Sequence, residues 1–325
     1  MIVDLPSTTT ARVNHALVEM RERGGAVALG RVLTLVIVTA DSAQVEESIE
    51  AANEASREHP CRVIVIARGL KRAATRLDAQ IRVGGDAGAS EVLVMRLYGP
   101  LADHGDSVVV PLLLPDCPVV AWWPDTAPAV PAEDPIGMLA QRRITDAAEA
   151  RQPVKALEQR RISYRDGDSD LAWARLTPWR ALLAAALDLP PHEDIQSAIV
   201  TGAVDNPSTD LLAGWLRSRL RVPVRRRTKD PGGGVNSVVM ERAAGPVELI
   251  RPDGRVGTLR QPGQPDRRVP LKRRPVRECL AEELRRLDAD EIYQASLEAL
   301  VEVESKPSQR RNGGGRRSSE AGGGA

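Results

Sequence analysis

Phenylalanine is absent from this sequence of 325 residues, which contains only five tryptophans and three tyrosines. Apolar residues still make up 42% of the chain, so it can bury sizeable cores, but Leu, Val, Ile and Ala must build them. The length is typical of two domains of ordinary size. We therefore expect a two-domain protein with mainly aliphatic cores.

Neither sign of charge predominates, because 45 basic residues are balanced by 44 acidic ones and the formal net charge is +1. The chain therefore has no global field that would steer it toward nucleic acid or a membrane. No stretch approaches the roughly 18 uninterrupted apolar residues of a membrane-spanning helix. The opening segment, MIVDLPSTTT, lacks the basic and apolar regions of a signal peptide. We expect a cytoplasmic protein without a membrane anchor.

Cysteine is scarce as well. Cys61, Cys117 and Cys279 lie far apart in the sequence and outside any C-x-x-C pair. An odd number of separated cysteines is typical of a reducing compartment and argues against a disulfide framework. We interpret the three as small buried hydrophobes.

Motifs of catalysis and cofactor binding are also missing. None of the four histidines has a second histidine three or four positions away, so no zinc site is indicated. There is neither a G-x-S-x-G nucleophile elbow nor a G-x-G-x-x-G dinucleotide fingerprint. Gly25 and Gly30 have the spacing of a phosphate-binding loop, but Arg31-Val32 replaces its Lys-Ser/Thr pair. We predict no cofactor, no metal and no catalytic residue, and hence a protein that is not an enzyme.

The first half of the chain alternates between apolar runs and helical patterns. We expect strands at residues 32–39, 61–67, 79–83 and 91–98, short strands ending with 118–123, and helices after Asp41 and at 136–150. Asp41 and Gln44 have the spacing of a capping box. The strand–helix–strand order predicts a parallel pair. Residues 1–165 are therefore predicted to form an α/β domain with a mostly buried sheet.

The second half predicts a smaller α+β domain, residues 166–304. We expect helices at 178–187, from Asn206-Pro207 onward, and at 276–287 and 289–303, with strands at 195–201 and 222–227 and hairpins up to residue 271. Thr177, Asn206 and the pair Asp288 and Glu291 are the expected caps. Residues 305–325 lack large apolar side chains, and their Gly, Arg and Ser content predicts a disordered tail.

Two local features are candidates for a partner interface. Adjacent strand residues point to opposite faces, so only one of Trp122 and Trp123 can enter a single core, and the other is a candidate interface anchor. A strand that is buried on both faces explains the pair equally well. The run Arg225, Arg226 and Arg227 is the second candidate, because arginine is enriched at protein interfaces. A nucleic-acid surface would also be basic, but no aromatic residues are interleaved with these arginines, so we do not expect nucleic-acid binding.

Four further segments follow one another in order along the chain: PCRVIVIARG at residues 60–69, PVVAWWPD at 118–125, DLAWARLTPWRALLAAALD at 170–188 and LDADEIYQASLEAL at 287–300. Together they resemble the OpcA family of glucose-6-phosphate dehydrogenase assembly proteins. The resemblance covers roughly residues 10–303, and the tail lies outside it.

The resemblance implies a non-enzymatic protein that assists the assembly or allosteric activation of glucose-6-phosphate dehydrogenase. That enzyme produces NADPH at the entry to the oxidative pentose phosphate pathway. In some family members the thiol redox state is linked to activation, so the resemblance makes Cys61, Cys117 and Cys279 candidates for redox-sensitive residues. Two alternatives stay open: an enzyme that acts on a sugar phosphate through an arginine-built anion site, and a nucleic-acid-binding protein.

Overall fold

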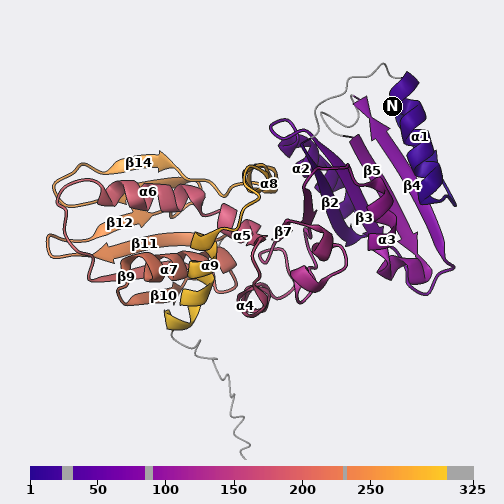
Figure 1. Ribbon diagram of the computed structural model, residues 1–325. Helices are drawn as coiled ribbons and strands as arrows, with labels where there is room; N and C mark the ends of the chain where they lie inside the picture. Colours follow the sequence, from indigo (N-terminus) through magenta and orange to yellow (C-terminus); the bar gives the residue numbers. More distant parts are fainter. Residues whose placement is uncertain (24–31, 85–90, 230–232, 306–325) are drawn as a thin grey trace, which may run out of the picture.

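The structure of the chain is a computed structural model that describes residues 1–23, 32–84, 91–229 and 233–305. Two β-sheets with their helices lie side by side, and α4, α5 and α8 lie between them (Figure 1). The predicted α/β class is confirmed. The glycines with phosphate-loop spacing and the predicted tail beyond residue 305 lie outside the described residues. Within the described ranges, no helix is long and apolar enough to cross a bilayer.

The first sheet has eight strands in the order β1-β4-β5-β3-β2-β6-β7-β8. Their bounds are Ile2–Leu5 (β1), Leu33–Ala40 (β2), Cys61–Arg68 (β3), Arg76–Val83 (β4), Glu91–Tyr98 (β5), Val119–Trp122 (β6), Arg142–Thr145 (β7) and Asp168–Asp170 (β8). The six adjacent strands β5, β3, β2, β6, β7 and β8 run parallel to one another, and β4 lies antiparallel beside β5. The order reverses between β2 and β6, which therefore flank a topological switch point.

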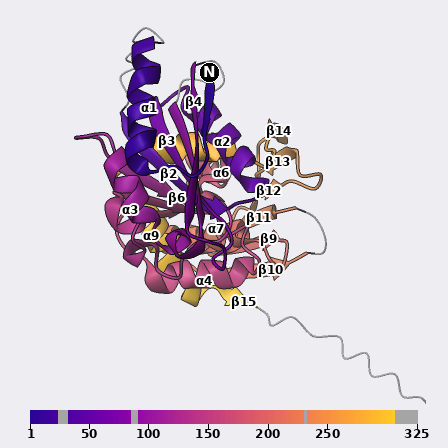
Figure 2. The ribbon, with the colours of Figure 1, turned by 90° about the vertical axis from the view of Figure 1, so that its right-hand side faces the viewer.

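Both faces of the first sheet are covered by helices. β2 and β3 are apolar at nearly every position and almost fully buried, as expected for strands between two helical layers. One core contains residues of α1 (Thr10–Arg23) and α3 (Gly105–Val109), and the other contains residues of α2 (Gln44–Ala55). Figure 2 shows α1 and α3 on one side of these strands and α2 on the other.

The second sheet has seven strands in the order β14-β13-β12-β11-β9-β10-β15. Their bounds are Ser197–Gly202 (β9), Val224–Thr228 (β10), Val235–Glu241 (β11), Val247–Ile250 (β12), Val256–Arg260 (β13), Arg267–Pro270 (β14) and Glu304–Ser305 (β15). The predicted hairpins are confirmed from β11 to β14, whereas β9 and β10 pair in parallel through α7. Helices α6 (Thr177–Leu187), α7 (Pro207–Leu220) and α9 (Glu291–Glu298) share one apolar core with this sheet.

Helix α8 (Val276–Leu284) follows β14 of the second sheet in the sequence but packs on the first sheet. Cys279, Leu280 and Leu284 belong to the core between α2 and the first sheet. The short helix α5 (Leu171–Ala174) contributes Leu171 to that core and Trp173 to the core of the second sheet. The predicted boundary between two domains at residue 165 therefore stays a prediction. Helix α8 comes from the second predicted domain but packs on the sheet of the first.

Two predicted elements in the first half are wrong. Residues 136–150 contain a 3₁₀ turn (Gly137–Leu139) and the strand β7 instead of a helix, and the helix lies later, as α4 (Pro153–Ser163). The proline-interrupted run before β6 forms α3 and a 3₁₀ helix (Val110–Leu112), because proline disfavours a ladder but fits a first helical turn. β1 and α1 were not anticipated.

Three of the predicted helix caps are also wrong. The Asp41 carboxylate accepts hydrogen bonds from Arg96 and Tyr98 instead of capping α2. The Thr177 hydroxyl donates to Glu282, and α9 is capped by Asp290 rather than Asp288. The side chains of Asp41 and Thr177 instead bind partners that are distant in the sequence. Asn206 caps α7 as predicted, with its side-chain oxygen accepting from the Thr209 amide.

Candidate functional site

The topological switch point of the first sheet is where parallel sheets of this strand order commonly bind a dinucleotide. The turn from β2 to α2, residues 40–44, contains no glycine that would let a pyrophosphate approach the backbone. Asp41 in this turn is already bound, at 3.2 Å from the Arg96 guanidinium and 2.9 Å from the Tyr98 hydroxyl. Glu46 and Glu47 occupy the first turn of α2. Glu46 is paired with Arg82 (2.6 Å), and the carboxylate of Glu47 would repel a phosphate. These residues do not fit a dinucleotide.

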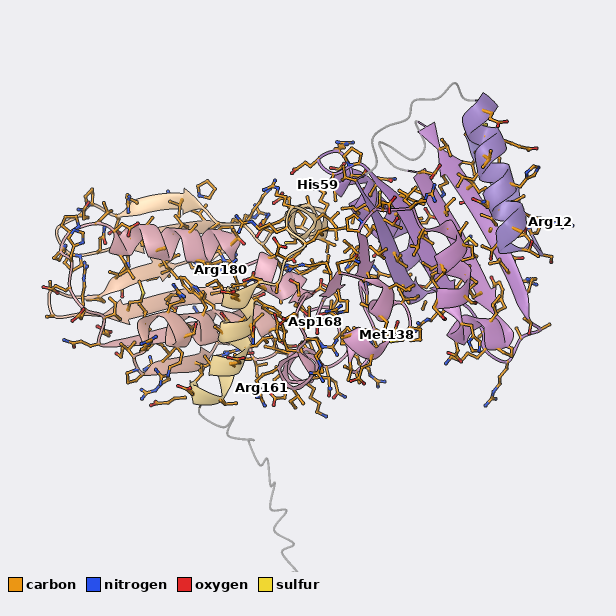
Figure 3. The ribbon with its side chains drawn as sticks, viewed as in Figure 1. Arg12, His59, Met138, Arg161, Asp168 and Arg180 are labelled. Atoms are coloured by element: carbon orange, nitrogen blue, oxygen red, sulfur yellow. The ribbon has the colours of Figure 1, made fainter. Side chains whose placement is uncertain are left out.

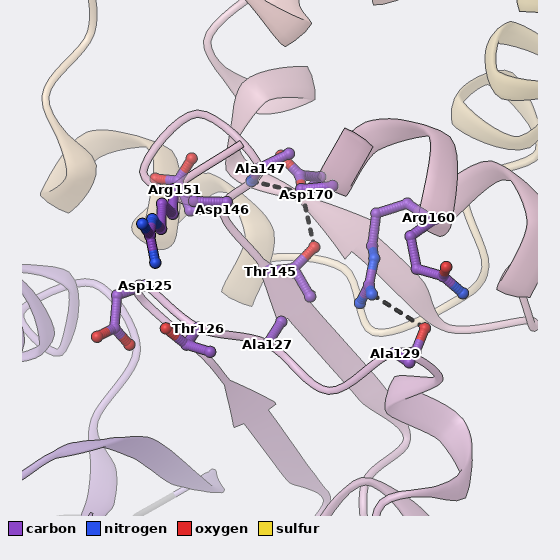
Figure 4. Close-up of a pocket in the computed structure, with 13 residues that line it drawn as sticks. Asp125, Thr126, Ala127, Ala129, Thr145, Asp146, Ala147, Arg151, Arg160 and Asp170 are labelled. Carbon is purple, nitrogen blue, oxygen red and sulfur yellow. Dashed lines mark hydrogen bonds between the residues drawn. The ribbon is translucent and has the colours of Figure 1, made fainter. Parts of the chain in front are cut away.

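A separate pocket opens beside the switch point, where β6, β7 and β8 end. It has a volume of about 310 Å³ (Figure 4). Its lining residues are Asp125, Thr126, Ala127, Ala129, Thr145, Asp146, Ala147, Ala150, Arg151, Ala156, Gln159, Arg160 and Asp170. The alanines supply small apolar walls, and the polar groups come from the strand ends and from α4. We refer to this cavity as the strand-end pocket.

Two buried carboxylates lie at the floor of the strand-end pocket. The Asp170 side chain accepts hydrogen bonds from the Thr145 hydroxyl (2.6 Å) and from the amides of Ala147 and Ala172 (2.9 Å each). Asp146 is held by both terminal nitrogens of the Arg175 guanidinium, at 2.7 and 2.6 Å. Burial, reinforced by the nearby Asp146 carboxylate, raises the pKa of Asp170 to about 7.

Arg160 of α4 is a buried cation in the lining of the strand-end pocket. The residue is only 7% exposed, and its Nη2 donates to the carbonyls of Pro128 (2.6 Å) and Ala129 (3.0 Å). Its Nη1 has no hydrogen-bond partner in the described part of the chain. Burial lowers the pKa of Arg160, because the charged form has lost its water, although an arginine remains charged at neutral pH. Across the pocket, Asp125 Oδ1 is likewise without a partner among the described residues.

The raised pKa of Asp170 predicts a pH effect on stability. The folded protein holds this proton up to about pH 7, whereas an unfolded aspartate loses it near pH 3.9. The free energy of unfolding should therefore fall as the pH rises between these values, by up to about 1.4 kcal/mol per pH unit. Urea unfolding of wild type and Asp170→Asn from pH 4.5 to 7.5 measures this, because the variant cannot titrate.

The comparison isolates Asp170 from the other titratable groups that face it, which are Asp146, Arg160, Arg175 and Tyr293. We expect the stability of wild type relative to Asp170→Asn to decline steadily across the range. A difference that stays constant with pH would show that Asp170 is ionised throughout.

The arginine run predicted as an interface lies on β10, where the side chains alternate. Arg226 is buried, and its guanidinium binds Asp210 (2.8 Å) and the Gly202 carbonyl (3.1 Å), so it is structural. Arg225 and Arg227 are exposed, and Arg225 forms a surface ion pair with Glu304 (3.1 Å). All three line a groove of about 500 Å³ together with Val154, Val204, Asp210 and Thr228. We call this the basic groove.

The tryptophan pair does not reach the surface. Trp122 packs in the core under α2, and Trp123 packs in the opposite core under α1. Both are buried, so the alternative of a strand buried on two faces explains them, and we remove them from the candidate interface. Trp173 and Trp179 are buried as well and offer no platform for stacking nucleic-acid bases.

The three cysteines are distributed unevenly. Cys61 and Cys279 are buried in the same core, whereas Cys117 is half-buried elsewhere, and none of the three forms a disulfide. Burial raises the pKa of the Cys279 thiol to about 12, so at neutral pH it is protonated and a poor nucleophile. Redox sensitivity of these residues stays a prediction.

The strand-end pocket was not predicted from the sequence. Its carboxylates, Asp125, Asp146 and Asp170, each stand at or just after the end of a strand. Because the carboxyl ends of parallel strands share one edge of a sheet, this recurrence could have indicated the site.

Two family models match the chain. One describes the N-terminal domain of a glucose-6-phosphate dehydrogenase subunit and matches residues 52–162, and the other describes the C-terminal domain and matches residues 166–297. The chain belongs to the OpcA family of glucose-6-phosphate dehydrogenase assembly proteins. The resemblance inferred from the four sequence segments is confirmed.

Solved structures offer weaker likeness. Biliverdin reductase from Synechocystis, bound to biliverdin and NADP+, is 10% identical with a TM-score of 0.43, covering 83% of this chain and 96% of its own. An oxidoreductase from Thermotoga maritima is 14% identical with a TM-score of 0.38 and the same two coverages, 83% and 96%. Neither likeness is strong enough to support a conclusion about this chain. A search of curated proteins finds no match.

Proposed function

We propose that this protein is a non-catalytic, cytoplasmic partner of glucose-6-phosphate dehydrogenase that supports the assembly and activity of that enzyme, and so NADPH production in the oxidative pentose phosphate pathway. The main support is the match to both domains of the dehydrogenase-subunit family, from residue 52 to residue 297.

An activator must bind the active state of the enzyme more tightly than the inactive state. A tenfold shift in that equilibrium requires about 1.4 kcal/mol of differential binding, which a few interface contacts supply. The direct test follows NADPH formation by the dehydrogenase as the chain is added. We expect a saturable increase in rate, and a rate that stays unchanged at every ratio would contradict activation.

The basic groove is our proposed contact surface. It combines two exposed apolar side chains, Val154 and Val204, with the exposed guanidinium groups of Arg225 and Arg227. Arginine pairs with carboxylates through two parallel hydrogen bonds and is enriched at interfaces. The groove therefore suits a segment of the dehydrogenase that carries acidic and apolar side chains.

Reversing one charge in the groove tests this surface. Arg227→Glu places a carboxylate where we expect the partner's acidic side chain, and like charges in an interface cost several kcal/mol. We expect the dissociation constant of the complex to rise at least tenfold, measured by biolayer interferometry. Arg12→Glu is the matched control, because Arg12 is exposed on α1 at the far end of the molecule (Figure 3). If both variants bind like wild type, the contact lies elsewhere.

A further inference from the structure

The strand-end pocket contains two polar groups that the protein itself leaves unused. Arg160 Nη1 and Asp125 Oδ1 are buried atoms without a hydrogen-bond partner among the described residues, and both residues line the cavity. A buried donor or acceptor without a partner costs about 1–3 kcal/mol, so proteins seldom retain one without a reason. The positively charged side chain of Arg160 and the negatively charged side chain of Asp125 therefore line the same cavity.

The charge balance of the strand-end pocket favours an anion. The carboxylate of Asp146 is neutralised by the guanidinium of Arg175, which binds both its oxygens. The raised pKa of Asp170 means that this group is largely uncharged below about pH 7. While Asp170 is protonated, the remaining charges on the lining are those of Asp125, Arg151 and Arg160, which leave one net positive charge.

The remaining lining groups suit hydroxyls. Asp125 accepts hydrogen bonds, and Thr126 and Gln159 can both donate and accept. The volume of about 310 Å³ lies at the lower end of ligand pockets, about 300–1,000 Å³, which suits a small metabolite rather than a dinucleotide. The alanine walls leave room beside the arginines without adding bulk.

We propose that the strand-end pocket binds a small polyhydroxylated anion of the sugar-phosphate class, with its anionic group on Arg160 and Arg151 and a hydroxyl on Asp125. Arg160 is the principal anion ligand, because two carbonyls already hold its guanidinium in place. Arg151 lies at the exposed edge of the cavity and completes the charge. Figure 4 shows Arg160 with a hydrogen bond to Ala129 on the same side of the cavity.

Calorimetric titration of the purified chain tests the proposal without the dehydrogenase. The probes are glucose 6-phosphate, glucose and inorganic phosphate. We expect glucose 6-phosphate to bind at least tenfold more tightly than either of its halves. Binding of phosphate as tightly as glucose 6-phosphate would indicate an adventitious ion only, and no detectable binding of glucose 6-phosphate at millimolar concentration would also overturn the proposal.

Variants locate the site. Arg160→Met should weaken glucose 6-phosphate binding at least tenfold, whereas Arg161→Met, the next residue on the same helix, should leave it unchanged because Arg161 pairs with Glu158 outside the pocket lining. Loss of binding in both variants, or in neither, would contradict the assignment. If Arg160→Met does not fold, the more exposed Arg151→Met and Asp125→Asn decide the question by the same tenfold criterion.

The calorimetric result can fail independently of the proposed function. Binding of a sugar phosphate to the isolated chain depends on the strand-end pocket alone, and complex formation with the dehydrogenase depends on a different surface. Helix α4 contributes to both sites, because Arg160 lines the strand-end pocket and Val154 lines the basic groove.

Discussion

Replacing Glu283 by alanine is expected to lower the free energy of unfolding by about 3–5 kcal/mol, the usual cost of breaking a buried ion pair. Glu283 lies on α8 and binds Arg142 of β7 at 2.5 Å, with both side chains only 4% exposed. This ion pair joins α8 to β7 of the first sheet. Arg142 also donates a hydrogen bond to the Asp288 carbonyl at 2.7 Å. Without Glu283, a guanidinium that cannot lose its proton stays buried without a counter-charge.

Loss of Arg142 and loss of Glu283 are expected to lower the free energy of unfolding by different amounts. Burial raises the pKa of Glu283, so in Arg142→Ala the carboxyl can take up a proton and escape part of the penalty. Arg142→Ala should therefore be less destabilising than Glu283→Ala. The double variant Arg142→Met/Glu283→Leu removes both charges and should recover most of the lost stability. Urea denaturation at pH 7 measures all three. A Glu283→Ala midpoint equal to that of wild type would show that α8 is not held by this pair.

Replacing Trp179 by alanine should destabilise the core of the second sheet by a similar amount. Trp179 of α6 is 3% exposed, and its ring packs in the core of the second sheet with the Arg251 guanidinium carbon 5.1 Å from the ring centroid. Removing a buried tryptophan costs about 3–5 kcal/mol, a large part of a total stability of 5–15 kcal/mol. We expect a lower melting temperature and a lower yield of soluble protein, with any loss of dehydrogenase activation following from unfolding.

The control for Trp179 is Ile162→Ala, which truncates a large side chain that is 63% exposed on α4. Its melting temperature should remain within about 2 °C of wild type, because little apolar area returns to water. The opposite outcome for Trp179→Ala, a normal melting temperature together with lost binding to the dehydrogenase, would make Trp179 an interface residue.

Apolar runs made parts of the fold predictable. β2 and β3 are nearly all aliphatic and are buried on both faces, and the glycine-containing turns of the second half mark its hairpins. β7 could not be predicted, because its sequence RRIT looks polar. Its arginines are buried only because Asp168 and Glu283, 25 and 141 residues away in the chain, neutralise them. Pairings over such distances leave no local pattern.

The candidate sites were only partly predictable for the same reason. Alternation along β10 separates Arg226, which is structural, from Arg225 and Arg227, which are exposed, but the sequence alone did not show which face was buried. The strand-end pocket forms because strand register brings Asp125, Asp146 and Asp170 to one edge of the sheet. Its unpartnered atoms depend on side-chain positions that no sequence pattern specifies.

The central claim is that this chain binds glucose-6-phosphate dehydrogenase, and size-exclusion chromatography with light scattering tests it most directly. The purified chain and its cognate dehydrogenase are mixed at micromolar concentration under reducing and under oxidising conditions. We predict a new species that contains both proteins and has a mass above that of either alone. Separate elution of the two proteins under both conditions would contradict the account.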